Sequence, residues 1–127
     1  MDKENLLKII NELNLPKSEY YILGGGSLVM YGLREKTSDV DLCVSIELFE
    51  KLRQEYNLND TEKNQYGFYH INELTEVVPK DKKDFLFDVI NEYQVEKLIS
   101  ILNFKKERNL PKDQNDIKNI IDYLEKN

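Results

Sequence analysis

The sequence is poor in the features that mark secreted and membrane proteins. It contains one cysteine, Cys43, in 127 residues, which excludes a disulfide within the chain and suits a reducing cytoplasm. No apolar run approaches the roughly 20 residues that span a bilayer. The N-terminal stretch MDKENLLKII lacks the charged-then-apolar layout of a signal peptide. We therefore expect a soluble cytoplasmic protein with no membrane contact.

An excess of basic residues is also missing. The chain has 18 Lys and Arg against 24 Asp and Glu, a formal net charge of -6. A general nucleic-acid backbone binder needs a basic surface that releases counterions, so that class is disfavoured, although a local basic pocket for one nucleotide is not. Hydrophobic residues make up 40% and charged residues 33%, the ordinary range of a globular chain. The length predicts a single domain over residues 1–127.

Local patterns predict an α/β or α+β architecture, with a central mixed sheet flanked by helices and a helical C-terminal third. Apolar residues at helical spacing and their capping signals predict helices at 4–13, 27–31, 46–56, 95–106 and 112–125. Short apolar or alternating runs predict strands at 20–23, 39–44, 66–71, 74–78 and 84–90.

Two aspartates open one of these strands. Side chains at i and i+2 of a strand point to the same face, so Asp39 and Asp41 should project together. Paired carboxylates repel unless a cation lies between them, and hard divalent cations such as magnesium take oxygen ligands of this kind. Any strand with one solvated face shows the same alternation, so the pair alone is weak evidence.

A glycine-rich turn precedes the aspartates. Gly24, Gly25, Gly26 and Ser27 follow an apolar strand and lead into a short helix, where backbone N–H groups and the Ser27 hydroxyl can face an anion. A plain tight turn is the alternative. The spacing matches neither the dinucleotide fingerprint nor the P-loop. An anion site beside a metal site is what a metal-bound triphosphate requires.

A third carboxylate is expected on a neighbouring strand if two metal ions are to be held. The segment DFLFDVI offers Asp84 and Asp88. Asp88 lies between Leu86 and Ile90 on one face of the expected strand, and a carboxylate inside such a strand is costly unless it is paired or coordinated. Asp84 adjoins a charged turn. We therefore favour Asp88.

Together these residues resemble the nucleotidyltransferase superfamily, which includes DNA polymerase β, antibiotic nucleotidyltransferases and small bacterial minimal transferases of toxin–antitoxin type. The resemblance runs from about residue 20 to residue 124, although the spacer after the serine is one residue longer than in the minimal transferases. The helical substrate domain of the antibiotic-modifying enzymes is missing. The matching positions are Gly25, Gly26, Ser27, Gly32, Arg34, Thr37, Asp39, Asp41, Asp88, Lys105, Lys112, Asp113 and Asp116.

The resemblance implies transfer of a nucleoside monophosphate from an NTP to an unidentified hydroxyl on a small molecule, an RNA end or a protein. Asp39, Asp41 and Asp88 would hold two Mg²⁺ ions, or Mn²⁺, with Asp88 also a candidate general base. Lys105, Arg108 and Lys112 would screen the charge of the triphosphate. The alternative is that they form a solvated basic helix end. The residues implied to bind the nucleotide are Gly25, Gly26, Ser27, Arg34, Thr37, Lys105 and Lys112.

Two other hypotheses stay open. One is a non-catalytic nucleotidyltransferase-like module that binds a partner protein, as an antitoxin does. The other is a globular domain whose aspartate pair is an exposed strand face. The presence of all three acids favours the active enzyme, because a decayed member would be free to lose one. The sequence does not identify the acceptor, the preferred base or the oligomeric state.

Overall fold

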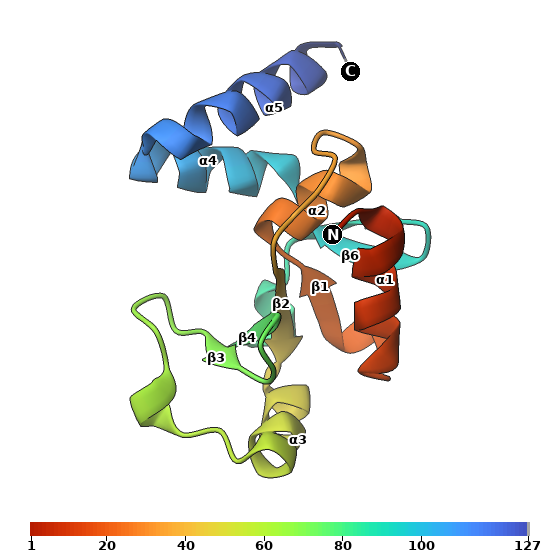
Figure 1. Ribbon diagram of the computed structural model, residues 1–127, viewed down its shortest axis with the longest axis vertical. Helices are drawn as coiled ribbons and strands as arrows, with labels where there is room; N and C mark the ends of the chain where they lie inside the picture. Colours follow the sequence, from red (N-terminus) through yellow and green to blue (C-terminus); the bar gives the residue numbers. More distant parts are fainter. Residues whose placement is uncertain (127) are drawn as a thin grey trace.

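The computed structural model describes residues 1–126 and contains a six-stranded sheet with helices at both ends of the chain (Figure 1). None of the helices in this range is both long and apolar enough to cross a bilayer. The strands are β1 (Tyr20–Ile22), β2 (Val40–Ser45), β3 (Tyr69–His70), β4 (Thr75–Lys80), β5 (Phe87–Ile90) and β6 (Tyr93–Glu96). The α-helices are α1 (Lys3–Glu12), α2 (Gly24–Tyr31), α3 (Ile46–Tyr56), α4 (Leu98–Arg108) and α5 (Gln114–Lys126).

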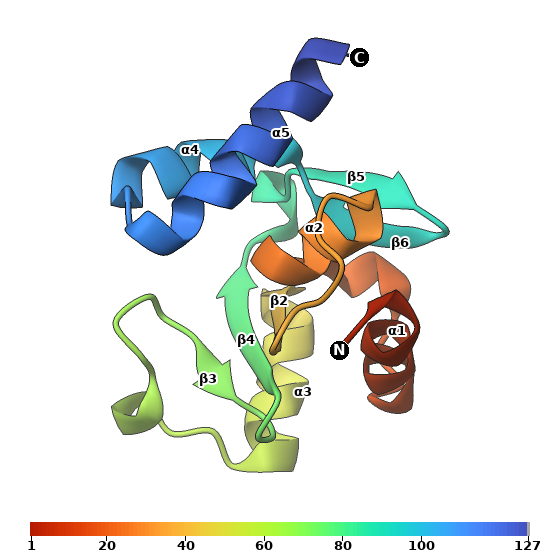
Figure 2. The ribbon, with the colours of Figure 1, turned by 45° about the horizontal axis from the view of Figure 1, so that its top comes forward.

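The sheet is mixed, in the order β3-β4-β2-β1-β6-β5. β2 runs antiparallel to β1 and parallel to β4, and β1 runs parallel to β6. β3 and β5 therefore form opposite edges, as Figure 2 shows. The expected α/β class, with a mixed sheet and a helical C-terminal third, is confirmed.

The main core lies between the sheet and the first three helices. Leu6 and Ile10 of α1 lie one helical turn apart and are both buried in it. From β2 the core receives Val40 and Leu42, whose period-2 spacing puts them on one face. The opposite parity leaves Asp41 on the other face, away from this core.

A second, smaller core joins α2 to the two C-terminal helices. Leu28 of α2 packs with Ile101 of α4 and Ile120 of α5. In Figure 1, α4 and α5 lie together at the end of the molecule above α2. Because α2 contributes to both cores, its position relative to the sheet is determined from two sides.

Strand β6 was not expected from the sequence, which instead predicted a helix beginning near residue 95. Asn91 and Glu92 have φ values of 51° and 74°, the left-handed pair that a two-residue hairpin turn requires. The turn folds β6 back against β5, and α4 begins only at Leu98. The usual glycine is absent from this turn, so its sequence signal is weak.

Candidate active site

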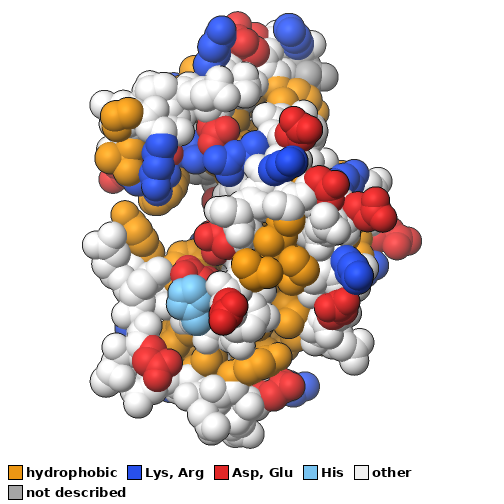
Figure 3. All heavy atoms as spheres, viewed as in Figure 1, with side chains coloured by type: hydrophobic (Ala, Val, Ile, Leu, Met, Phe, Trp, Pro, Cys, Tyr) orange, Lys and Arg blue, Asp and Glu red, His pale blue; other side chains and the backbone are white. Residues whose placement is uncertain are grey.

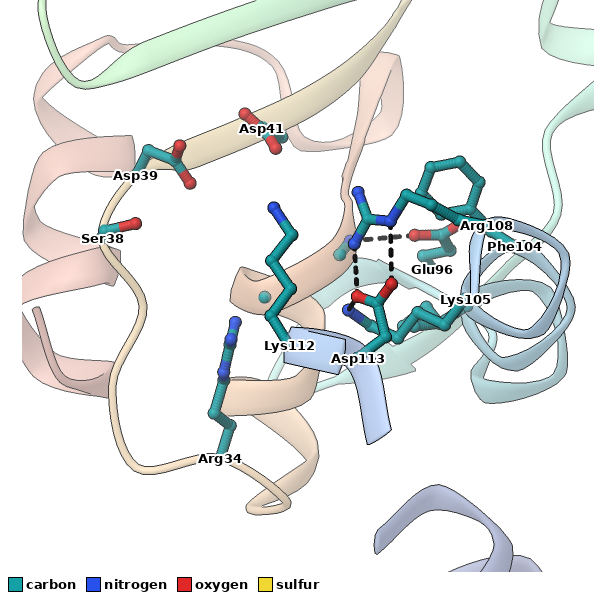
Figure 4. A pocket seen from close by; sticks show the side chains of 13 residues that line it. Arg34, Ser38, Asp39, Asp41, Glu96, Phe104, Lys105, Arg108, Lys112 and Asp113 are labelled. Carbon is teal, nitrogen blue, oxygen red and sulfur yellow. Dashed lines mark hydrogen bonds and ion pairs between the residues drawn. The ribbon is translucent and has the colours of Figure 1, made fainter. Parts of the chain in front are cut away.

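The structure brings the two aspartates together beside a set of basic side chains. Asp39 immediately precedes β2 and Asp41 lies on it, and Figure 4 shows both carboxylates facing the space into which Arg34 and Lys112 point. We call this space the cationic hollow. Its polar lining residues are Arg34, Ser38, Asp39, Asp41, Glu96, Lys105, Arg108, Lys112 and Asp113, with Gly24 and Gly25.

Asp41 is held in an electrostatically unfavourable position. Its Oδ1 is buried and has no hydrogen-bond partner within residues 1–126. Burial, followed by the nearby carboxylates of Asp39 and Glu76, raises the pKa of its carboxyl group to about 7. A buried, unpartnered carboxylate oxygen among other carboxylates is costly in the absence of a cation.

The donor set fits a hard divalent cation. Within the described part of the chain, no three His, Cys, Asp or Glu side chains are arranged as a ready-made metal cage. Magnesium does not need one, because proteins usually hold it through one or two carboxylates and the phosphates of the substrate. Asp39 and the unpartnered oxygen of Asp41 match that pattern.

The glycines lie inside α2 rather than in a turn before it, because the helix begins at Gly24. Gly24 has a φ of 53°, which favours glycine, and its N–H donates a 2.9 Å hydrogen bond to Glu96 Oε1. The next N–H, of Gly25, belongs to the first turn and has no partner within the helix. A side chain at Gly25 would overlap Arg34 and Thr37. Glycine here lets the loop carrying both residues close over the helix start.

Three of the expected nucleotide-binding residues do not line the cationic hollow. Ser27 is fully buried and its hydroxyl donates to the Glu96 carbonyl oxygen at 2.8 Å. A side chain at Gly26 would meet Ile22. Thr37 is also buried, and its Oγ1 donates to the carbonyl oxygen of Asp39 at 3.3 Å. These residues hold the helix and the loop that shape the hollow.

Asp88 lies away from the aspartate pair. Its strand, β5, is the sheet edge and is separated from β2 by β1 and β6. The burial argument for this residue is wrong, because its side chain is 49% exposed. The carboxylate accepts a 2.7 Å hydrogen bond from the Tyr31 hydroxyl and lies 3.5 Å from Lys97. Asp88 is therefore paired with Tyr31 and Lys97 at the surface. Two strands separate it from the strand that carries Asp41.

The carboxylate that the strand order brings beside Asp41 is Glu76. The two residues are register partners on the parallel strands β2 and β4, which places them about 5 Å apart along the hydrogen-bonding direction. Glu76 Oε1 in turn lies 2.8 Å from Nε2 of His70 on the next strand. The sequence carried one signal for Glu76: it is the acidic residue inside the predicted strand 74–78.

Basic side chains on the opposite wall are held by two buried carboxylates. Lys105, which is 8% exposed, lies 3.4 Å from Asp113 and 3.2 Å from Asp116. Asp116 also lies 3.5 Å from Arg34. Arg108 makes two hydrogen bonds to Asp113, and this guanidinium holds the Asp113 pKa well below its usual range. The network fixes where the cations point.

A second hollow opens beside the first. We call it the aromatic hollow. It shares Gly24, Asp41, Glu96, Phe104 and Arg108 with the cationic hollow and adds Glu76, Asn64, Tyr66 and Phe68. In Figure 3, Lys and Arg side chains gather above the notch at the left of the molecule with acidic side chains among them, and acidic side chains and the histidine lie below it. Asp41 lines both hollows and therefore stands where a mainly polar space meets a more apolar one.

The comparisons with known proteins agree with this geometry at the level of the fold. No family model and no curated protein matches the chain. A solved structure of ANT(2")-Ia, in complex with adenylyl-2"-tobramycin, superposes with a TM-score of 0.61 at 20% sequence identity. The match covers 94% of this chain and 85% of that chain. The chain has a nucleotidyltransferase-like fold. At this identity the similarity concerns the fold alone.

Proposed function

We propose that this protein is a metal-dependent nucleotidyltransferase that moves a nucleoside monophosphate from an NTP to a hydroxyl acceptor. One observation carries the proposal: the unpartnered carboxylate oxygen of Asp41, beside Asp39, faces Arg34 and Lys112 across one hollow. An unpartnered carboxylate oxygen opposite two cationic side chains is complementary to a metal-bound triphosphate. That ANT(2")-Ia is seen with an adenylylated product is consistent with this reaction class.

Each wall of the cationic hollow has a role in this proposal. Asp39 and Asp41 would hold Mg²⁺, which supplies charge stabilisation at the phosphoryl group that is transferred. The N–H of Gly25 at the start of α2 would donate to a phosphate oxygen. Arg34 and Lys112 would bind the remaining phosphate charge by charge-assisted hydrogen bonds.

Glu76 would accept the proton of the acceptor hydroxyl. It lines the aromatic hollow next to Asp41, which is the open side from which an acceptor can approach. The acceptor oxygen forms a bond to the α-phosphorus, the bond from that phosphorus to the bridging oxygen breaks, and pyrophosphate leaves. Glu76 thus takes the place that the sequence assigned to Asp88.

Thermal shift with Mg²⁺ and each of ATP, GTP, CTP and UTP tests the proposal. We expect nucleotide-dependent stabilisation of the wild type that requires the metal and disappears in the double variant Asp39→Asn/Asp41→Asn. The control is Mg²⁺ alone, which separates metal binding from triphosphate binding. If none of the four nucleotides shifts the melting temperature, the proposal fails and the partner-binding alternative is favoured. A pull-down would then be the next experiment.

A matched pair of variants tests which acid completes the site. Glu76→Gln and Asp88→Asn each remove one negative charge, the first from β4 beside β2 and the second from the edge strand β5. We expect Glu76→Gln to abolish pyrophosphate release once an acceptor is identified and to weaken Mg²⁺–NTP binding, whereas Asp88→Asn leaves both unchanged. The reverse result would restore Asp88 as the third carboxylate.

A further inference from the structure

Two aromatic side chains meet at the mouth of the site without being buried there. Tyr66, in the segment before β3, is 54% exposed, and Phe104, on α4, is 45% exposed. Their ring centroids are 6.1 Å apart at an interplanar angle of 84°. One face of Phe104 is covered by the Arg108 guanidinium, 4.9 Å from the ring centroid. Two partly exposed aromatic rings in contact beside a hollow offer a flat apolar face on which a ligand can stack.

The position of this pair limits what the partner can be. Phe104 and Arg108 line both the cationic hollow and the aromatic hollow, and Tyr66 lines the aromatic one. A triphosphate in the cationic hollow, with its α-phosphate beside Asp41, leaves its nucleoside to extend toward this shared wall. The group that arrives there is planar and apolar on its faces, and such groups stack on aromatic rings.

We propose that Phe104 and Tyr66 form the nucleobase subsite, in which the base stacks on the Phe104 ring and Tyr66 closes over it. This inference rests on the proposed function and deepens it. The edge-on contact between the two rings is replaced by rotation of Tyr66 about its side-chain bonds. Arg108, already layered on Phe104 and held by Asp113, keeps the Phe104 ring oriented for the base.

Asn64 contributes a polar group to the same wall. Its Oδ1 accepts hydrogen bonds from the backbone N–H groups of Tyr66, at 2.8 Å, and Phe68, at 3.0 Å. These bonds position the turn that carries Tyr66. They also occupy the amide oxygen, so the side chain has only its N–H groups to offer a base, which every purine and pyrimidine can accept. The subsite is therefore a stacking platform with weak base preference.

Calorimetric titration with Mg²⁺–ATP and with Mg²⁺–tripolyphosphate separates base binding from phosphate binding. We expect the wild type to bind ATP more tightly than tripolyphosphate. Phe104→Leu and Tyr66→Leu should each weaken ATP binding about tenfold, the scale of one base–aromatic stack, and leave tripolyphosphate binding unchanged. Tyr56→Leu, at an exposed aromatic residue at the end of α3, is the control and should change neither.

The outcomes distinguish this inference from the proposed function. If the wild type binds tripolyphosphate but gains nothing from the base, or if Phe104→Leu and Tyr66→Leu leave ATP binding intact, the base subsite is overturned and the triphosphate site stands. An equal loss of affinity for ATP and for tripolyphosphate in these variants also overturns it, because the rings would then act only by maintaining the shape of the hollow. If the wild type binds neither ligand with Mg²⁺, the proposed function fails and the inference fails with it.

Discussion

At the scale of single residues, Asp41 gives the site its most distinctive property, a carboxyl group whose pKa is raised to about 7 from the ordinary value of 3.8. The charged groups around it have opposite effects on its pKa: Asp39, Glu76 and Glu96 raise it, whereas His70 lowers it. Because burial contributes most, the ionised form is the one that the fold disfavours. A bound cation reverses that preference, so proton and metal compete for the same oxygen.

This competition predicts a specific pH dependence. Between about pH 4 and pH 7 Asp41 is ionised in the unfolded chain but protonated in the native state, so the native state binds more protons and the free energy of unfolding falls as pH rises. Above about pH 7 Asp41 is ionised in both states, so its titration no longer changes the free energy of unfolding. Asp41→Asn should remove this slope and be more stable than the wild type at pH 8, by about 1 kcal/mol or more. Urea denaturation across pH 4–8 measures both curves.

Added Mg²⁺ provides the check on this assignment. It should stabilise the wild type at pH 8 more than at pH 5, because only the ionised carboxylate is a ligand, and should have little effect on Asp41→Asn. Parallel curves for wild type and variant, with no effect of the metal, would show that the pKa of Asp41 is not raised and that Asp41 is not a metal ligand.

At the scale of elements, helix α2 performs two separate tasks at its two ends. Its start lies against Arg34 and Thr37, which leave no space for a side chain at Gly25. Its C-cap, Gly32, has a φ of 78°, and a side chain there would meet nothing. Gly25 is therefore needed because Arg34 and Thr37 approach the helix closely, whereas Gly32 is needed because its backbone is left-handed.

The two glycines predict opposite phenotypes. Gly25→Ala displaces the Arg34 loop but favours the helix, so we expect Mg²⁺–ATP affinity to fall about tenfold, or 1.4 kcal/mol, with little change in Tm. Gly32→Ala forces a strained left-handed residue, costing about 1 kcal/mol of stability, and should leave nucleotide affinity unchanged. Thermal unfolding and calorimetry on both variants compare the effects. A loss of affinity in Gly32→Ala alone would contradict this division.

At the scale of the whole molecule, a buried ionic network ties the C-terminal helices to the site. Asp113 is 1% exposed and holds Lys105 and Arg108, while Asp116 holds Lys105 and reaches Arg34 in the loop after α2. The second core is small, so the orientation of α4 and α5 depends on these pairs as well as on apolar packing.

Removing the anion from this network should be strongly destabilising. Asp113→Asn leaves Arg108 without its carboxylate partner and Lys105 with Asp116 alone, and breaking a buried pair in this way costs about 3 kcal/mol. Asp122→Asn, on the exposed side of α5, is the control and should change stability by less than about 0.5 kcal/mol. Equilibrium unfolding in urea measures both. Equal, small effects would mean that the helices are held by apolar packing alone.

Local physics in the sequence determined the fold class and the central pair of acids. The helical spacing of Leu6 and Ile10 predicted α1, and Ser45 caps α3 by accepting the Leu48 N–H at 3.1 Å, as its residue type indicated. The i, i+2 spacing put Asp39 and Asp41 on one side. These features depend on neighbours along the chain, which a sequence displays directly.

The remaining parts of the site were decided by tertiary structure. Asp88 and Glu76 are both acids within short predicted strands, and only the strand order reveals that β4 lies next to β2 while β5 lies at the far edge. The same holds for Ser27, whose hydroxyl turns to the Glu96 carbonyl on β6, a strand that the sequence did not predict. Contacts between segments distant in sequence depend on how strands and helices pack, and no local pattern encodes that choice.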